Sequence, residues 1–282
     1  MTAYAAHFAR LVKIEHTVFA LPFAYVGALL AAGGLPGWAE LGWITLAMVG
    51  ARSLAMGVNR LVDAGVDARN PRTATRELPA GRLRPWQVLV FCAAMLALFL
   101  VAVWQLDPLV RWLWPIPVAL FVLYPYLKRV TWLCHLWLGA SLGLAPVGAW
   151  VALTGELPWQ AWALGGAVLL WVAGFDLFYS LFDEEVDRRE GLHSWTTRWG
   201  RRGTFAGARA LHVGTVALLA VAGLGLEVGL SYWLGVLAVG ALLLYEHLLI
   251  RPDDLRRLDA AFFTVNGVIS LVFLGFVLVD VL

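Results

Sequence analysis

The sequence predicts an all-α, polytopic membrane protein. Of its 282 residues, 61% are hydrophobic and only 14% are charged, whereas about 25% of a soluble domain is charged. The mean hydropathy is +0.77, and long apolar runs recur along the whole chain. Many of these runs are long enough to cross about 30 Å of hydrocarbon as helices. The net charge of +2 is too small to favour binding of nucleic acid.

The amino-terminal segment, residues 1–15, is amphipathic, with Phe8 and Leu11 on one side and Arg10 and Lys13 on the other. We expect an interfacial helix here, and no removable signal peptide, because no apolar core is followed by a cleavage site. Nine apolar segments follow, and each is bounded by turn residues or charged residues. The predicted spans are residues 17–33, 41–63, 86–106, 112–127, 132–153, 160–182, 207–226, 229–248 and 260–281.

Turn residues and charges mark the ends of these spans. The first stops at GGLPG, the fifth at TGELP and the fourth at the basic pair Lys128 and Arg129. The second and sixth spans run into polar loops, which we expect at residues 64–85 and from 183 to about 206. Glycines in the fifth span, Gly139, Gly143 and Gly148, are typical of sites where helices pack closely.

The positive charges predict the topology. With nine spans, the amino terminus and the loops after the even-numbered spans share one side and hold nearly all Lys and Arg residues, whereas the other side has Arg111 and little else that is basic. The positive-inside rule then places the amino terminus in the cytoplasm and the carboxyl terminus outside. Spans 2 and 6 both end in acidic residues, and spans 4 and 8 in basic ones. This echo suggests that residues 1–282 form one domain of two four-helix halves plus a ninth helix.

Two sets of acidic residues lie at the cytoplasmic ends of spans. In the first, Asn59, Asp63 and Asp67 are four residues apart, so they follow one side of a helix over two turns. Arginines follow at once, at 72 and 76 among other positions. Carboxylates beside arginines suggest a cation that carries a phosphate with it.

In the second set, Asp176, Asp183 and Asp187 are spaced by seven and four residues, with Tyr179 between them. On one helix these carboxylates would lie within about 40° of one another. A charge inside a span, as at Asp176, costs at least about 2.5–3.5 kcal/mol unless it faces a polar cavity or a partner. Arg52, seven residues before Asn59, could be that partner in a buried structural pair.

Two acidic sets with arginines between them fit Mg²⁺ and a diphosphate. Mg²⁺ takes oxygen ligands, keeps several waters and shares its coordination sphere with phosphates. The basic side chains could take the outer phosphate oxygens, and pyrophosphate would be the leaving group. A long apolar tail on the substrate would explain why such a site lies in a bilayer.

Both motifs resemble the aspartate-rich signatures of the UbiA superfamily of intramembrane prenyltransferases, and the resemblance covers nearly the whole chain. Arg52 stands seven residues before Asn59, as in that family. PRTATREL at 71–78 resembles the arginine-rich continuation of the first motif, with Glu77 in place of a proline. GLHS at 191–194 resembles a GIKS-like segment, with His193 where a lysine is usual. The signatures themselves are Asn59-xxx-Asp63-xxx-Asp67, Asp176-xx-Tyr179-xxx-Asp183-xxx-Asp187 and Tyr124-xxx-Lys128-Arg129.

The resemblance implies nine helices around a central cavity and Mg²⁺-dependent transfer of a polyprenyl group from its diphosphate to an aromatic acid. It implies a membrane enzyme, in the inner or plasma membrane of a prokaryote, whose active site faces the cytoplasm. By position, Arg52 would meet the carboxylate of the acceptor, while Tyr124, Asp176 and Tyr179 would line the space between the substrates. The metal–diphosphate residues would be Asn59, Asp63, Asp67, Asp183 and Asp187, and those that grip the phosphates Arg72, Arg76, Lys128 and Arg129.

Segments 13–24 and 59–74 most resemble the 4-hydroxybenzoate polyprenyltransferase branch, which serves ubiquinone or menaquinone biosynthesis. A hydroxynaphthoate acceptor fits the same segments. Two other classes of protein compete with an enzyme. A cation-coupled transporter would place its acidic residues near the bilayer midplane, but the only charged residues that approach this depth are Asp176 and Arg52. A scaffold would need no membrane-proximal carboxylates at helical spacing.

Overall fold

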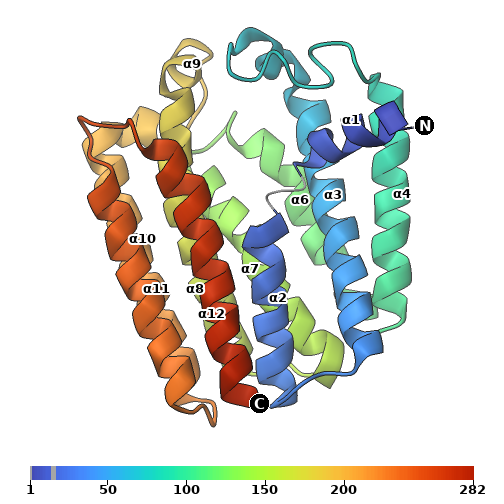
Figure 1. Cartoon of the computed structure of the whole chain (residues 1–282). Coiled ribbons are helices and arrows are strands. Elements are labelled where there is room, and N and C mark those ends of the chain that lie inside the picture. The colour runs from blue at the N-terminus through green and yellow to red at the C-terminus, as the bar shows by residue number, and fades with distance from the viewer. Residues whose placement is uncertain (1, 14–16) are drawn as a thin grey trace.

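The computed structural model describes residues 2–13 and 17–282, which form helices joined by mostly short loops, with no β-strand among them (Figure 1). The predicted all-α class is therefore confirmed. The helices are α1 (Thr2–Val12), α2 (Thr17–Ala32), α3 (Trp38–Arg69), α4 (Pro85–Trp104), α5 (Val110–Leu113), α6 (Pro115–Leu127), α7 (Cys134–Thr154), α8 (Trp159–Tyr179), a 3₁₀ turn η2 (Ser180–Asp183), α9 (Glu184–Arg189), α10 (Trp195–Leu224), α11 (Leu230–Leu249), a π-helical turn η3 (Ala260–Val265) and α12 (Asn266–Val281).

Within the described residues, eight helical segments are long and apolar enough to cross a membrane. The ninth expected span corresponds to α2, which has 16 residues and is about 24 Å long at ~1.5 Å per residue. The count of nine therefore stays a prediction, as do the cytoplasmic amino terminus and the internal repeat. Helix α1, the carboxyl end of α3 and helix α9 lie at one end of the bundle, and the carboxyl terminus lies at the other (Figure 1).

Helix α3 extends six residues beyond the predicted end of its span, to Arg69. The first acidic set therefore lies on one continuous helix. The second set does not, because α8 ends at Tyr179 and the 3₁₀ turn η2 precedes α9. A 3₁₀ turn has about 3.0 residues per turn instead of 3.6. The expectation that Asp176, Asp183 and Asp187 share one helical face is therefore wrong.

The second polar loop is also shorter than predicted, because α10 begins at Trp195 rather than near 207. The side chain of Ser194 accepts a hydrogen bond from the backbone N–H of Thr197 at 3.2 Å and so caps the helix. Gly200, at φ +65°, allows a kink within α10 that residues with a side chain rarely adopt. The polar first turns of α10 therefore continue a membrane helix into the polar end of the bundle.

Helices α7 and α8 pack closely through glycine. A Cβ atom at Gly143 would lie 2.5 Å from the carbonyl oxygen of Gly165, and one at Gly139 would meet the backbone of Leu169. At Gly148, by contrast, a Cβ atom would have nothing within 4 Å. The expected close packing is therefore confirmed at two of the three glycines and is wrong at Gly148.

We expect Gly143→Ala to destabilise the fold by about 1–3 kcal/mol, because the added methyl group forces α7 away from α8. Thermal unfolding of the detergent-solubilised protein measures this effect. The matched control is Gly148→Ala on the same helix, which adds the same group into open space. Equal shifts in the two variants would show that the spacing between α7 and α8 does not limit stability.

Candidate active site

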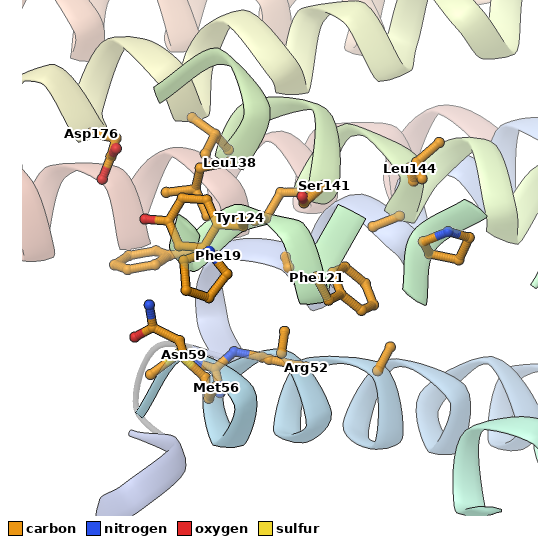
Figure 2. A pocket seen from close by; sticks show the side chains of 18 of the residues that line it. Phe19, Arg52, Met56, Asn59, Phe121, Tyr124, Leu138, Ser141, Leu144 and Asp176 are labelled. Carbon is orange, nitrogen blue, oxygen red and sulfur yellow. The ribbon is translucent and has the colours of Figure 1, made fainter. Parts of the chain in front are cut away.

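A cavity of about 550 Å³ is lined by every site residue that the sequence predicts. Its polar end contains both acidic sets, and Figure 2 shows its middle part, with Asn59 and Arg52 on one wall and Asp176 on the opposite wall. Apolar side chains such as Phe121 and Leu144 line the part of the cavity away from the acidic sets (Figure 2), and Trp114 is also part of the lining. The cavity therefore has a strongly charged part and an apolar part.

Four carboxylates at the polar end each pair with a basic side chain. In the first set, Asp63 Oδ1 lies 3.0 Å from Arg129 Nη2, and Asp67 Oδ1 lies 2.6 Å from Arg76 Nη1. Asn59 also donates a hydrogen bond to Asp63 at 3.0 Å. The first set thus faces basic residues both from its own following loop and from the end of α6.

In the second set, Asp183 Oδ2 lies 2.5 Å from Arg72 Nη2, and Asp187 Oδ1 lies 2.8 Å from Lys128 Nζ. Asp187 is only 1% exposed, and its buried Oδ2 atom has no hydrogen-bond partner among the described residues. The four acids and four bases cancel in formal charge. Each pair joins a carboxylate to a basic residue that is expected to grip phosphate. The carboxylates and the basic side chains therefore lie close enough together to contact one ligand.

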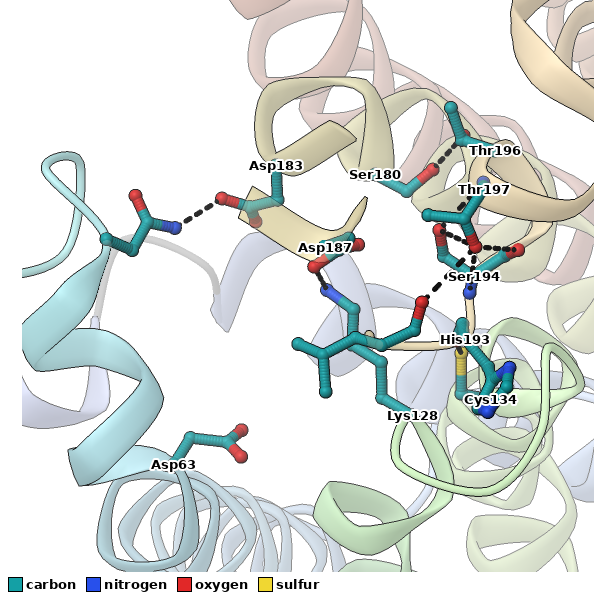
Figure 3. A network of polar contacts seen from close by, with 12 residues as sticks. Asp63, Lys128, Cys134, Ser180, Asp183, Asp187, His193, Ser194, Thr196 and Thr197 are labelled. Carbon is teal, nitrogen blue, oxygen red and sulfur yellow. Dashed lines mark hydrogen bonds and ion pairs between the residues drawn. The ribbon is translucent and has the colours of Figure 1, made fainter. Parts of the chain in front are cut away.

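The loop after α3 joins the two acidic sets directly. The buried side chain of Asn70 donates a hydrogen bond of 2.7 Å to Asp183 Oδ1, and Arg69 forms an ion pair with Glu190 at 2.7 Å. Figure 3 shows Asp63 facing Asp183 and Asp187 across the space between them. The sets therefore meet at one end of the bundle, as two acidic clusters acting on one ligand require.

Arg72 and Lys128 keep their positive charges for a physical reason. Burial alone would lower the pKa of Arg72, but Tyr179 and Asp183 outweigh it and raise that pKa above its ordinary value. Its guanidinium donates to the Tyr179 hydroxyl at 2.8 Å. For Lys128, burial is again outweighed, here by Asp187, so the pKa of the amine is raised. Both side chains are cationic at neutral pH.

Arg52 does not pair with Asp176. Its guanidinium donates hydrogen bonds of 3.0 Å to the backbone oxygens of Val12 and Lys13, at the end of α1. Asp176 instead lies 2.7 Å from Nδ1 of His135 on α7. The structural Arg52–Asp176 pair considered from the sequence is therefore wrong, and the buried carboxylate instead has a histidine partner that no spacing rule indicated.

Three further cavity residues were missed from the sequence. Asn70 is followed by proline, a signal for a helix end but not for a contact 113 residues away. Arg60, 6% exposed, donates to the backbone oxygen of Leu11 at 3.4 Å and helps Arg52 to hold α1. Lys13 lies at the mouth of the cavity, with its amine 5.9 Å from the ring of Phe263.

The segment at 191–194 acts through its backbone. The N–H of His193 donates to the carbonyl oxygen of Lys128 at 2.7 Å, close to the Lys128–Asp187 pair in Figure 3. This hydrogen bond therefore holds the loop against the carboxyl end of α6, where Lys128 lies. Residues 14–16, within the segment used for the branch assignment, lie outside the described part of the chain.

The carboxylate oxygens of the site could bind a hard divalent cation only if they first left their Arg and Lys partners. Among the described residues, no three His, Cys, Asp or Glu side chains already converge on a point where a metal could bind. The carboxylate oxygens in the four ion pairs already have basic partners, while the buried Asp187 Oδ2 has none within the described part of the chain. A ligand that brings both a cation and phosphate oxygens could replace all four internal ion pairs at once.

Comparisons with known proteins agree with this geometry. The profile described as UbiA prenyltransferase family matches residues 20–268. The chain is 34% identical to a 4-hydroxybenzoate octaprenyltransferase of Saccharophagus degradans, over 89% of this chain and 83% of the relative. It is 32% identical to a protein of the same name from Marinobacter nauticus, over 98% and 95%.

Solved structures show the same fold. The apo structure of a UbiA homolog from Aeropyrum pernix K1 has a TM-score of 0.85 and 31% sequence identity, and the match covers 95% of this chain and 99% of that one. A UbiA homolog from Archaeoglobus fulgidus bound to GPP and Mg²⁺ has a TM-score of 0.78 at 19% identity, over 97% and 98%. At this level of identity, the second match shows similarity of fold alone.

Proposed function

The chain belongs to the UbiA prenyltransferase family, and from this premise we propose that it transfers a polyprenyl group from polyprenyl diphosphate to 4-hydroxybenzoate or a similar aromatic acid in quinone biosynthesis. It is an integral membrane enzyme, a prenyltransferase. The observation that carries the proposal is the cavity whose charged end contains four acid–base pairs and whose other end is apolar. The diphosphate would occupy the first part and the prenyl chain the second.

The acids and bases would divide the charged headgroup between them. Arg72, Arg76, Lys128 and Arg129 would leave their carboxylates to bind phosphate oxygens, which a planar guanidinium can meet through two hydrogen bonds. Mg²⁺, when bound, would neutralise the diphosphate and stabilise the negative charge of the leaving group. The residues that would hold it are Asn59, Asp63, Asp67, Asp183 and Asp187.

The apolar part of the cavity would exclude water from the reacting centre. The C–O bond to the diphosphate would break where the charged and apolar parts meet, and an electron-rich ring carbon of the acceptor would attack the allylic cation. Tyr124, Tyr179 and Asp176 line the space between the charged and apolar ends. By the positive-inside rule, the charged end faces the cytoplasm, where both the water-soluble acid and the released pyrophosphate would exchange.

The direct test supplies the purified protein with one prenyl diphosphate and a panel of aromatic acids, and identifies the products by mass. We expect prenylated 4-hydroxybenzoate. A hydroxynaphthoate product instead would keep the reaction and change the acceptor, as the sequence also allows. No prenylated acid in an otherwise folded preparation would contradict the proposal.

Arg52 is the proposed site for the acceptor carboxylate. We expect Arg52→Ala to raise the KM for 4-hydroxybenzoate by about 10- to 100-fold, since a hydrogen-bonded charge contributes about 1.5–3 kcal/mol, with little change in the KM for the prenyl diphosphate. The neutral amide of the same acid is the internal control, because it offers no carboxylate. If the variant lost both acceptors equally, Arg52 would serve only to hold the end of α1.

A further inference from the structure

A buried imidazole stands directly behind Asp176. His135, 4% exposed, lies on α7 with Nδ1 2.7 Å from Asp176 Oδ2. The backbone N–H of Trp195, at the start of α10, donates to the other ring nitrogen at 3.2 Å. Because Nε2 accepts a hydrogen bond, the neutral ring carries its hydrogen on Nδ1 and donates it to Asp176. That hydrogen bond fixes the orientation of the Asp176 carboxylate.

Asp176 differs from the other four aspartates of the site. Each of those pairs with an arginine or lysine, whereas among the described residues Asp176 pairs with His135 alone. No described residue donates a hydrogen bond to Asp176 Oδ1. The carboxylate lines the cavity, as does Tyr124 (Figure 2). Asp176 is thus a carboxylate whose Oδ1 atom takes no part in the ion pairs of the charged end.

We propose that His135 is a positioning residue that holds the Asp176 carboxylate turned into the cavity, so that Asp176 takes the proton lost from the aromatic ring. The inference rests on the proposed function. The allylic C–O bond breaks and its electron pair leaves with the diphosphate, while a π pair of the ring forms the new C–C bond. The C–H bond at that carbon then breaks, its electrons restore aromaticity, and its proton goes to Asp176. The released pyrophosphate, itself a base, then accepts that proton.

A merely structural role for His135 is the competing explanation, because the ring also joins α8 to the start of α10. The two roles differ in the step that they affect. Loss of a structural link lowers stability and affects every step through the folded fraction. Loss of the hydrogen bond to the base slows removal of the ring proton, which then becomes visible in the rate.

The experiment compares wild type with His135→Leu and His135→Gln, using 4-hydroxybenzoate with hydrogen or deuterium on the ring carbons beside the hydroxyl. We expect His135→Leu to lower kcat by about 10- to 100-fold, to leave the KM for prenyl diphosphate unchanged, and to react more slowly with the deuterated acid. His135→Gln should restore most of the rate and abolish the isotope effect, because its amide can donate to Asp176 and accept from Trp195.

The matched control is His212→Leu, which removes another buried imidazole, on α10 and outside the cavity lining, and should show no isotope effect. If His135→Leu does not fold, His135→Asn offers the same comparison, since its shorter amide cannot reach both partners. The inference is overturned if the folded variant shows no isotope effect, or if glutamine rescues no activity. A wild-type protein that prenylates no aromatic acid would instead refute the proposed function.

Discussion

Asp183→Asn is expected to lower the rate of pyrophosphate release by about 10²- to 10³-fold, which is the usual loss when one electrostatic stabiliser of a transition state is removed. Asp183 receives hydrogen bonds from Arg72 and Asn70, both in the loop that follows α3 and the first acidic set. Asparagine keeps the size and one oxygen but not the negative charge. Measurement of pyrophosphate released from geranyl diphosphate, with Mg²⁺ and a saturating acceptor, gives the rate.

The matched control for this substitution is Glu190→Gln. Glu190 follows α9 in the same polar segment but pairs with the exposed Arg69 and does not line the cavity. Because an exposed ion pair contributes little free energy, this variant should retain nearly the wild-type rate. Should Asp183→Asn also retain that rate, the second acidic set would have no part in the chemistry.

The spacing of acids along the sequence predicted the site because a helix converts spacing into direction. Residues four apart on α3 do line the cavity together, and the basic residues at 72, 76, 128 and 129 do face them. What spacing could not supply was the pairing of individual acids with individual bases. Asp187 and Lys128 are 59 residues apart, and only the tertiary fold brings the two side chains together.

The misplaced elements have local causes. The break between α8 and α9 falls where Ser180 turns its hydroxyl back onto the carbonyl oxygen of Leu177 and contacts Thr196, so the acids after it leave the face of Asp176. The early start of α10 was hidden by polar residues that hydropathy assigns to a loop. The Ser194–Thr197 cap was a readable signal for it. The His135–Asp176 contact had no such signal, because an apolar context makes a lone histidine look structural.

Mg²⁺ and the prenyl diphosphate are expected to bind with positive coupling, each raising the affinity for the other by about 10- to 100-fold, within the usual range of coupling free energies. The reason is the cancellation of charge at the polar end. A diphosphate alone must take Arg72 and Lys128 from Asp183 and Asp187, and leaves those acids unpaired. A cation alone takes the acids and leaves the bases unpaired. Together the two ligands satisfy both groups, so neither cost is incurred.

Isothermal titration of the purified protein tests this coupling with geranyl diphosphate in EDTA or in Mg²⁺, and with Mg²⁺ in the presence or absence of a non-hydrolysable analogue. Lys128→Met is the informative variant, because it removes one internal partner and leaves Asp187 without a base. It should weaken binding of the diphosphate while raising the affinity for Mg²⁺ alone. Equal diphosphate affinity with and without Mg²⁺ would mean that the four ion pairs persist in the complex, and the headgroup would then have to bind outside the charged end of the cavity.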